Sequence, residues 1–302
     1  MKFKNLSVLF ISVFLAFSCS NASNDNYKSL LWKISGNGLE NPSYLFGTHH
    51  LTPISFLDSI PGIFEIFEQT EQTIGELDLN NLGEMQMRLL SESFLPEHVT
   101  YDSLLNDEDQ QLLDSALRNT LGDGIDVFGQ LKPAMLQNLI SIAQFQKKYP
   151  SPSNNVGLDE YFQQEADKRF RPVIGLETVE DQIYVLLNSQ TLERQTELLM
   201  CAVKHPDLTA KLIEDLQVAY YNQDLDKIQK LYEVDLPDDP CPSTQEEKDI
   251  IGKNRNEKWL EKLPQLMEQK SSFIAVGCAH LPGKYGLIEG LRRLGYRVEP
   301  VK

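Results

Sequence analysis

Two short segments near opposite ends of this 302-residue chain have the same layout, and they constrain the fold more than any other feature. One apolar run, Ser43 to Phe46, leads into Gly47-Thr48-His49-His50. The other, Ser272 to Val276, leads into Gly277-Cys278-Ala279-His280. If the two runs are neighbouring strands of one sheet, both imidazoles leave the same sheet edge. A metal site or a general-base site can be assembled in this way from residues that are distant in sequence.

The pattern around these segments predicts an α/β (α+β) fold with a central sheet built from both chain ends. Residues 30–80 are typical of strand, turn, strand, helix and strand, and residues 272–301 of strand, helix and strand. The pattern from about 82 to 270 is mostly helical, with one strand at 171–176. We therefore expect one domain over 30–302, with helices packed on the sheet and a large helical insertion. The predicted helices of the insertion are 84–93, 106–121, 133–148, 158–168, 178–189, 191–204, 207–221, 224–234 and 244–268, the last with a break near Lys262-Leu263-Pro264.

The first residues have the pattern of an export signal. A basic start is followed by the apolar run Leu6 to Phe17, which is too short to span a bilayer as a mature helix. Ser18-Cys19 then ends it, as in a lipoprotein signal whose cysteine becomes the lipidated first residue. We predict a signal peptide over 1–18, lipidation at Cys19, a flexible tether over 19–29 and attachment to a membrane of the cell envelope. Plain secretion and an uncleaved anchor are the alternatives.

The charge and the cysteines limit the partners and the compartment. Removing residues 1–18 deletes Lys2 and Lys4 and leaves 26 basic against 44 acidic side chains, a net charge of −18. This disfavours nucleic acid and anionic lipid head groups as partners. In an exported protein, Cys201 and Cys241 either pair in a disulfide or remain buried free thiols. Cys278 would be left over.

His50 and His280 are the first candidates for chemistry. A lone loop histidine is usually a surface polar group, but two in matching strand-Gly-x-x-His contexts favour a shared site. His49 competes with His50, and neighbours on an extended segment point in opposite directions. Because Ala279 stands at the place equivalent to His49, the comparison favours His50.

Glu76 and Asp78 occupy alternate positions of a predicted strand over 73–79, so both could face one side. Acids inside an apolar strand cost free energy unless they are paired or bind a metal. A solvent-facing edge is the alternative, and we favour it for Asp78. Two histidines and one carboxylate are a common ligand set for a catalytic divalent metal with an open position. The open position would hold a water molecule whose pKa falls toward neutrality.

Arg255, Asn256 and Glu177 are further candidates. Arg255 is either a solvated helix residue or a clamp for an anion or a transition state, with Asn256 as a hydrogen-bond partner. Glu177 follows the strand at 172–176, so it is either a functional group at the sheet edge or a carboxylate at a helix N-terminus. Cys278 could be a nucleophile with a histidine base, but a small buried side chain is favoured.

Taken in order, these motifs resemble the TraB/PrgY/GumN family, whose animal members are the Tiki proteins. The resemblance rests on the two Gly-x-x-His segments, on Gly75-Glu76-Leu77-Asp78 and on the segment from Val276 to Gly283. It covers residues 30 to 301. His49 departs from the family, which usually has an apolar residue there, and Cys278 replaces a usual Gly or Ala. The other positions that look like family positions are Gly157-Leu158-Asp159, Gly175-Leu176-Glu177-Thr178 and Arg255-Asn256.

The resemblance implies a fold similar to erythromycin-esterase-like and ChaN-like proteins and a metal-dependent protease activity. It implies a divalent metal, Mn, Co or Zn, held by His50, Glu76 and His280, with Arg255 nearby. We expect a membrane-tethered peptidase acting on a peptide or protein substrate, in which Glu76 or a histidine handles the proton and Arg255 stabilises the oxyanion. One alternative is a binding protein of the same fold that holds haem, a metal or a peptide without turnover. Another is a non-catalytic envelope protein whose acidic helical middle meets a partner.

Overall fold

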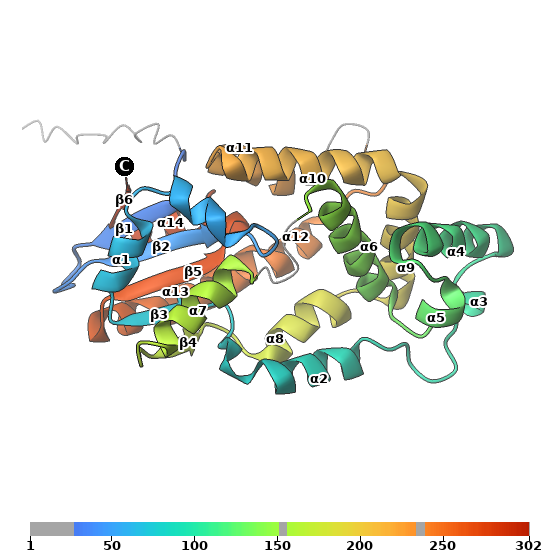
Figure 1. Ribbon diagram of the computed structural model, residues 1–302, viewed down its shortest axis with the longest axis horizontal. Helices are drawn as coiled ribbons and strands as arrows, with labels where there is room; N and C mark the ends of the chain where they lie inside the picture. The colour runs from blue at the N-terminus through green and yellow to red at the C-terminus, as the bar shows by residue number, and fades with distance from the viewer. Residues whose placement is uncertain (1–26, 151–155, 234–238, 302) are drawn as a thin grey trace, which may run out of the picture.

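A computed structural model describes residues 27–150, 156–233 and 239–301 of the chain. Across these residues, six strands form one mixed sheet in the order β4-β3-β5-β2-β1-β6 (Figure 1). The predicted α/β fold with a sheet built from both chain ends is confirmed, because only β4 comes from the middle of the chain. The predicted signal peptide and Cys19 lie outside the described residues. The strands are β1 (Leu31–Ser35), β2 (Ser43–Thr48), β3 (Gln72–Gly75), β4 (Val173–Gly175), β5 (Ser272–Gly277) and β6 (Arg297–Pro300).

Four neighbouring strands are parallel, and their carboxyl ends therefore meet at one edge of the sheet. β5 lies between β2 and β3, and β4 pairs with β3. Gly47 of β2 stands opposite Val276 of β5, and Thr48 stands opposite Gly277. The two Gly-x-x-His segments leave the sheet side by side, as the sequence predicted. β1 and β6 extend the other side of the sheet as antiparallel strands.

Helices cover both faces of the sheet. On one face, Phe162 of α7 (Leu158–Asp167) lies 4.5 Å from Phe273 and 5.7 Å from Phe46 between ring centroids. Phe67 of α1 (Ile63–Gln69) lies 5.2 Å from Phe162. α13 (Lys253–Gln269) and α14 (Leu287–Arg293) lie behind the sheet in Figure 1. Covering both faces is what a mostly parallel sheet requires, since its strands are apolar on both sides.

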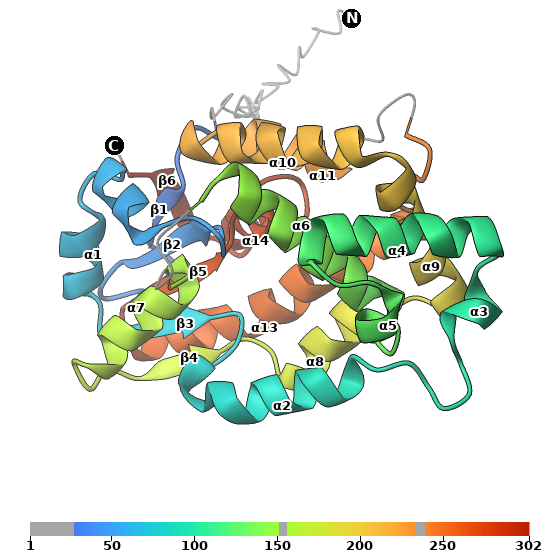
Figure 2. The same ribbon diagram turned by 45° about the vertical axis from the view of Figure 1, so that its right-hand side comes forward.

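The middle of the chain forms a helical part with a small core of its own. Its helices are α2 (Leu82–Glu92), α3 (Tyr101–Leu104), α4 (Asp107–Leu121), α5 (Ile125–Phe128), α6 (Pro133–Lys148), α8 (Val179–Ile183), α9 (Leu192–Lys204), α10 (Pro206–Tyr221), α11 (Leu225–Glu233) and α12 (Gln245–Ile251). α4, α6 and α9 pack on one another and bury Leu113, Leu136 and Leu199 completely. This part lies beside the sheet, on the right of Figures 1 and 2. Among the described residues, none of the helices combines the length and the apolar character needed to span a membrane.

The break predicted near Pro264 is wrong, because α13 runs through this residue. Asn256, Trp259, Leu263 and Met267 form a continuous buried stripe on α13, and the packing of that stripe outweighs the roughly 3 kcal/mol that an interior proline costs. The interruption lies at Gly252 instead, where φ is −110° and ψ is −80°. The predicted helix over 244–268 is therefore two helices, α12 and α13.

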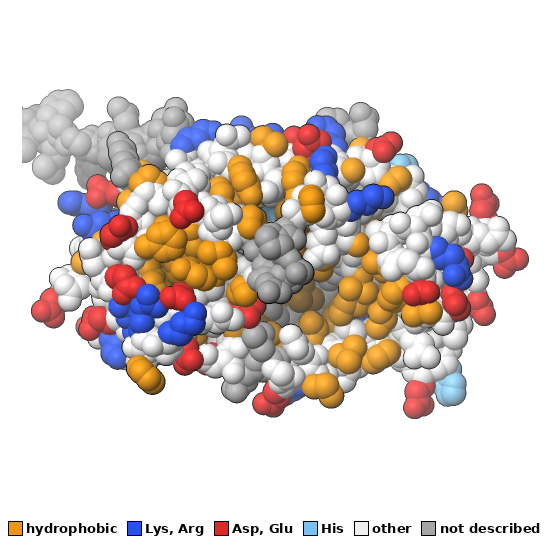
Figure 3. All heavy atoms as spheres, in the orientation of Figure 1, with side chains coloured by type: hydrophobic (Ala, Val, Ile, Leu, Met, Phe, Trp, Pro, Cys, Tyr) orange, Lys and Arg blue, Asp and Glu red, His pale blue; other side chains and the backbone are white. Residues whose placement is uncertain are grey.

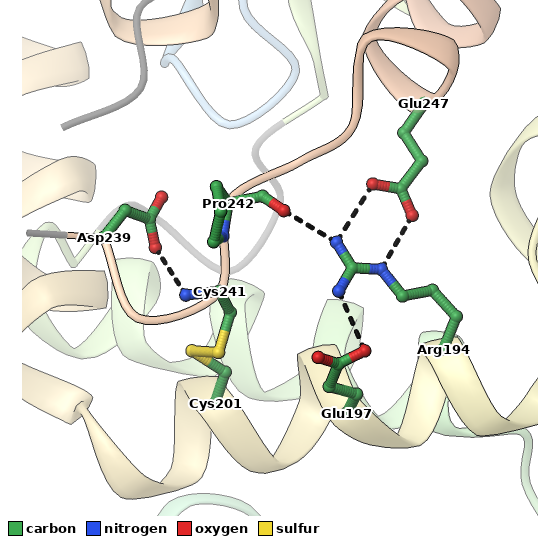
Figure 4. Close-up of a disulfide and its surroundings, with 7 residues drawn as sticks. All are labelled: Arg194, Glu197, Cys201, Asp239, Cys241, Pro242 and Glu247. Atoms are coloured by element: carbon green, nitrogen blue, oxygen red, sulfur yellow. Dashed lines mark hydrogen bonds and ion pairs between the residues drawn. A yellow bond between two sulfur atoms is a disulfide. The ribbon is translucent and has the colours of Figure 1, made fainter. Parts of the chain in front are cut away.

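A disulfide and an ion-pair network attach the segment before α12 to α9. Cys201 of α9 is bonded to Cys241, 40 residues later in the sequence (Figure 4). Arg194 of α9 donates from Nε to Glu247 Oε1 at 2.9 Å and from Nη2 to the Pro242 carbonyl at 2.8 Å. Of the two alternatives left by the sequence, the structure has the disulfide. The chain that leads into α12 and α13 is therefore fixed to the helical part.

Candidate functional site

The predicted site residues gather where the four parallel strands end. β3 ends at Gly75, so the predicted strand over 73–79 is too long, and Glu76 follows the strand instead of lying within it. The segment after Gly75 keeps one bond to the segment after β4, from the Glu177 amide to the Glu76 carbonyl at 2.9 Å, and then bonds to a helix. Gln163 of α7 donates to the Leu77 carbonyl at 2.9 Å and accepts from the Leu79 amide at 2.8 Å. Glu76 therefore lies at the sheet edge, next to the end of β5.

Arg255 of α13 is the centre of the site. Its Nη2 donates to Glu76 Oε2 at 2.6 Å, and its Nη1 donates to His280 Nε2 at 2.9 Å. Its Nε and Nη2 also donate to the two carboxylate oxygens of Glu177 at 3.0 and 2.6 Å. The three side chains of this ion-pair group are buried, with Arg255 12%, Glu76 10% and Glu177 5% exposed. Arg255 is therefore not a solvated helix residue, because its side chain is buried and paired with Glu76 and Glu177.

Glu76 is held as a carboxylate. Its Oε1 accepts from the Gly277 backbone amide at 2.7 Å, and its Oε2 accepts from Gln182 of α8 at 3.3 Å as well as from Arg255. Burial favours the neutral acid, but at the acidic pH where Glu76 titrates the positive charges of His280, Arg255 and His50, together with the Gly277 hydrogen bond, outweigh it and lower the pKa of Glu76 to about 2. Glu76 is therefore ionised throughout the physiological pH range.

His280 is held in one tautomer. Arg255 can only donate, so Nε2 of His280 accepts and its proton is on Nδ1. Nδ1 donates to Oδ1 of Asn256 at 2.7 Å, while the Asn256 amide nitrogen donates to the carbonyls of His280 and Tyr285 at 3.2 and 2.9 Å. Burial, together with the Arg255 charge, lowers the pKa of His280 to about 4. The Trp259 ring packs against the imidazole, with 4.5 Å between centroids.

His50 is held by a carboxylate of α7. Its Nδ1 lies 2.7 Å from Oδ2 of Asp159, whose other oxygen accepts from the Thr48 hydroxyl. Asp159 raises the pKa of His50, although the imidazole is 69% exposed and solvent weakens this effect. A Cβ on Gly157 would lie 2.9 Å from the His50 carbonyl, so α7 begins close to this segment because residue 157 is a glycine.

His49, Asp78 and Cys278 point away from this group. His49 packs between the rings of Phe145 and Tyr220 at 5.5 and 5.4 Å, and burial lowers its pKa to about 4. Its imidazole serves as a core ring, which is consistent with an apolar residue at this place in the family. Asp78 is exposed and accepts from the Asn80 amide at 3.0 Å. Cys278 is a buried free thiol, and burial raises its pKa to about 12, so it is unsuited to nucleophilic attack.

The site also contains four residues that the sequence did not predict as site residues: Thr48, Gln163, Gln182 and Trp259. Gln163 fixes the backbone after Glu76, and Gln182 bonds Glu76 directly. A buried glutamine on a helix has no local signal that separates it from an exposed one. For Gln163, one pattern could have indicated the site: it lies four residues after Asp159, so both side chains are on the same face of α7.

The donors fit a divalent metal in type. Asp159 and Asn256 each occupy the Nδ1 position of a histidine, which leaves Nε2 as the nitrogen for a ligand bond, and Glu76 supplies a carboxylate. The present arrangement does not bring these donors together as a set. In the ranges that the structure describes, no group of three or more His, Cys, Asp or Glu side chains is placed to hold a metal ion. Arg255 instead donates to both Glu76 and His280.

A cavity adjoins the Arg255 side of the site. It has a volume of about 400 Å³ and is lined by α8, α12 and α13 and by the segment Tyr184–Asn188, which continues α8 as a π-helix. Glu177 and Arg255 border it, but Glu76 and His280 are not among its described lining residues. The cavity therefore gives Arg255 free space on the side of Glu177.

Comparisons with known proteins agree with the motif order. A family model described as the TraB/PrgY/gumN family matches residues 30–300, which confirms the resemblance. Metalloprotease TIKI1 of Xenopus tropicalis is 27% identical over 92% of this chain and 62% of its own length. Metalloprotease TIKI2 of the same species is 25% identical over 92% and 60%, and human Metalloprotease TIKI1 is 26% identical over 90% and 61%. The chain thus spans about three fifths of the length of these relatives. No solved structure matches the chain significantly.

Proposed function

Because this chain belongs to the TraB/PrgY/gumN family, we propose that it is a metal-dependent hydrolase that cleaves peptide bonds. The observation that supports this most directly is that His50, Glu76 and His280 all follow the ends of neighbouring parallel strands, each with a second partner that orients it. The relatives named metalloproteases support the same reaction class. In fold, we propose a likeness to erythromycin-esterase-like and ChaN-like proteins.

His50, Glu76 and His280 would hold the ion, which would be Mn, Co or Zn. When bound, such an ion polarises a carbonyl and lowers the pKa of water. The protein's own residues would do the rest. Asp159 and Asn256 bond Nδ1 of the two histidines, so Nε2 of each would be the nitrogen that faces the ion once Arg255 releases His280. Glu76 is ionised and would accept a proton, and the buried positive charge of Arg255 would stabilise an oxyanion.

A polypeptide substrate is supported by the surface near the site. Large hydrophobic side chains are exposed on the helices beside the cavity, with Tyr184 52%, Leu186 44% and Leu90 51% exposed. Figure 3 shows hydrophobic side chains gathered on the lower right of the face drawn, over the region where Figure 1 draws α2 and α8. Such a surface suits apolar side chains of an extended chain. The acidic balance, a net charge of −16, argues against nucleic acid as a partner.

We also propose that the protein is exported and held on a membrane of the cell envelope through a lipid on Cys19. The basic start, the apolar run and the cysteine at its end support this. Mass spectrometry of the protein from its own cells tests it. The expected result is a mature N-terminus at Cys19 with acyl chains, and an intact Met1 would contradict it.

The test of the function combines metal binding and hydrolysis. The purified full-length chain, stripped with EDTA and refilled with Mn²⁺, Co²⁺ or Zn²⁺, is offered a peptide library. We expect metal-dependent cleavage, which His50→Ala and His280→Ala abolish. His205→Ala, which changes an exposed histidine on the helical part, is the matched control and should behave as the wild type. Metal binding without cleavage would favour the alternative, a binding protein of the same fold.

A further inference from the structure

Arg255 donates hydrogen bonds to two of the atoms that a metal ion would need as ligands. Nε2 of His280 has one lone pair, and it accepts from Nη1 of Arg255 at 2.9 Å. Oε2 of Glu76 accepts from Nη2 at 2.6 Å. An ion that ligates Nε2 must therefore take the lone pair from the guanidinium. Metal binding and this position of Arg255 exclude each other at His280.

Glu177 is a second carboxylate partner for the guanidinium of Arg255. Its carboxylate accepts from Nε and Nη2 of Arg255 at 3.0 and 2.6 Å, along the edge of the guanidinium that includes Nε. The cavity of about 400 Å³ borders Arg255 and Glu177. A guanidinium that gives up Glu76 and His280 can therefore keep its pair with Glu177 and turn toward this space.

We propose that Arg255 is a built-in competitor for the metal position and that Glu177 retains it when an ion enters. The proposal rests on the proposed metal-dependent function and adds to it the residue pair that sets metal affinity. Without an ion, Arg255 pairs with two buried carboxylates, which would be costly if unpaired. With an ion, the ion neutralises Glu76 and the guanidinium keeps Glu177.

The competition is tested by metal affinity. Equilibrium dialysis of the full-length chain against Mn²⁺, Co²⁺ or Zn²⁺ gives the dissociation constant, with no need for a substrate. Arg255→Met removes the competitor, and Arg255→Lys keeps the charge but cannot span Glu76, His280 and Glu177 with one ammonium group. We expect both variants to bind the ion about tenfold more tightly than the wild type, because the metal-binding state no longer competes with the Arg255 hydrogen bonds. Lys258→Met removes a positive charge of the same helix that is 69% exposed and pairs with Asp181 at 3.7 Å, outside the ion-pair group, and we expect the wild-type affinity.

Glu177→Gln gives a second readout in the opposite direction. It weakens the retention of the displaced guanidinium, so metal affinity should fall in the wild-type background. In the Arg255→Met background the same change should have no effect, since Glu177 acts through Arg255. Melting curves without metal should show that Arg255→Met is folded but melts at a lower temperature than the wild type. Added metal should narrow this difference in melting temperature.

The outcomes separate the two claims. If Arg255→Met binds more tightly but Arg255→Lys does not, the effect is one of charge and the competitor is overturned. If Glu177→Gln weakens binding equally in both backgrounds, Glu177 is itself a ligand and its retaining role is overturned. If the wild type binds metal and neither Arg255 variant binds more tightly, the competitor alone fails. If no variant binds any of the three ions, the metal-dependent function fails, and the competitor with it.

Discussion

The glycines of the two Gly-x-x-His segments have different neighbours, one a catalytic candidate and the other the protein core. A Cβ on Gly277 would lie 3.1 Å from Oε1 of Glu76, whereas a Cβ on Gly47 would lie 3.0 Å from the Cα of Cys278 and 3.1 Å from a methyl of Leu281. We expect Gly277→Ala to displace the carboxylate and reduce hydrolysis, with little change in stability. Gly47→Ala should instead lower the free energy of unfolding by about 1–3 kcal/mol, because it overpacks β2 against the segment that follows β5. Peptide hydrolysis and urea unfolding of both variants measure this.

The exposed Gly83 is the control for these substitutions, since a Cβ there meets no atom within 4 Å. Gly83→Ala should leave hydrolysis at the wild-type value and should not lower stability, since alanine in α2 adds up to about 1 kcal/mol of helix propensity. Equal losses of activity and stability in the Gly47 and Gly277 variants would contradict the division of roles.

Asn256 decides which nitrogen of His280 is available. Its Oδ1 accepts from Nδ1, and its own amide is fixed by two backbone carbonyls. Asn256→Ala should lower metal affinity or hydrolysis by about 10- to 100-fold, which is typical for the partner of a ligating histidine. Asn188→Ala, an exposed amide on the helical side, should change neither. Metal dialysis and hydrolysis that are unchanged in Asn256→Ala would show that Arg255 alone orients the ring.

At this scale the sequence predicted which residues meet but not how they bond. His50 could be preferred to His49 because Ala279 stands at the equivalent place, and the structure does turn His49 into an aromatic cluster. The central position of Arg255 could not be predicted, because it depends on how α13 crosses the edge of the sheet. A helical arginine has the same local pattern whether it is solvated or buried.

At the level of elements, the long helices were predictable and the short segments were not. α6 has the bounds that the sequence predicted, since its apolar spacing and its first-turn proline are both local signals. The length of β3 is not local. It ends where Gln163 bonds the next residues, and Gln163 lies in a different part of the sequence. Likewise, α13 contains Pro264 because of the tertiary packing of its buried stripe.

The contact between α9 and α12 should make stability depend on acid. Hydrogen bonds from Arg194, together with the Thr244 amide, lower the pKa of Glu247 to about 2 despite partial burial. A carboxyl with a lowered pKa in the folded state stabilises the protein above its unfolded pKa, near 4.5, and this contribution is lost as the pH falls toward 2. Glu247→Gln should therefore be less stable than the wild type at pH 7, and the difference should shrink as the pH falls from about 4.5 to about 2.

Urea unfolding of both proteins across this pH range checks the prediction. Glu197→Gln is the matched control, because Glu197 also pairs with Arg194 but its side chain is 61% exposed. It should have a small effect, as exposed pairs do. A wild-type advantage over Glu247→Gln that stays constant down to pH 2 would contradict the role of this carboxylate.

For the whole molecule, a sheet made from both chain ends followed from the two matching segments. The two strands are more than 220 residues apart in sequence, yet they pair in register at Thr48 and Gly277. The long helices between them were also predictable from periodicity, whereas the short α3 and α5 and the division of 244–268 into α12 and α13 were not. The attachment of the helical part to the sheet could not be predicted. It depends on single contacts, such as the hydrogen bond from the Tyr220 hydroxyl to the Gly47 carbonyl at 2.9 Å.

The disulfide should stabilise this attachment. It closes a segment with a sequence separation of 40 that includes α10, the helix that carries Tyr220. In the chain-entropy account, replacing both cysteines by serine lowers the free energy of unfolding by about 4 kcal/mol. We expect this loss in urea unfolding of Cys201→Ser/Cys241→Ser, and a similar loss when the wild type is reduced.

Cys278→Ser is the control for the loss of a thiol, because Cys278 is not in the disulfide. Reducing the Cys201–Cys241 bond should lower the stability of this variant by the same amount as that of the wild type. Because Tyr220 joins the closed segment to the first Gly-x-x-His segment, the double variant should also expose α10 and α11 to proteolysis before the sheet unfolds. If the double variant unfolds at the wild-type urea concentration and with the same cleavage pattern, the ion pairs of Arg194 hold this segment without the disulfide. In that case the bond would be dispensable for joining the helical part to the sheet edge that carries the site.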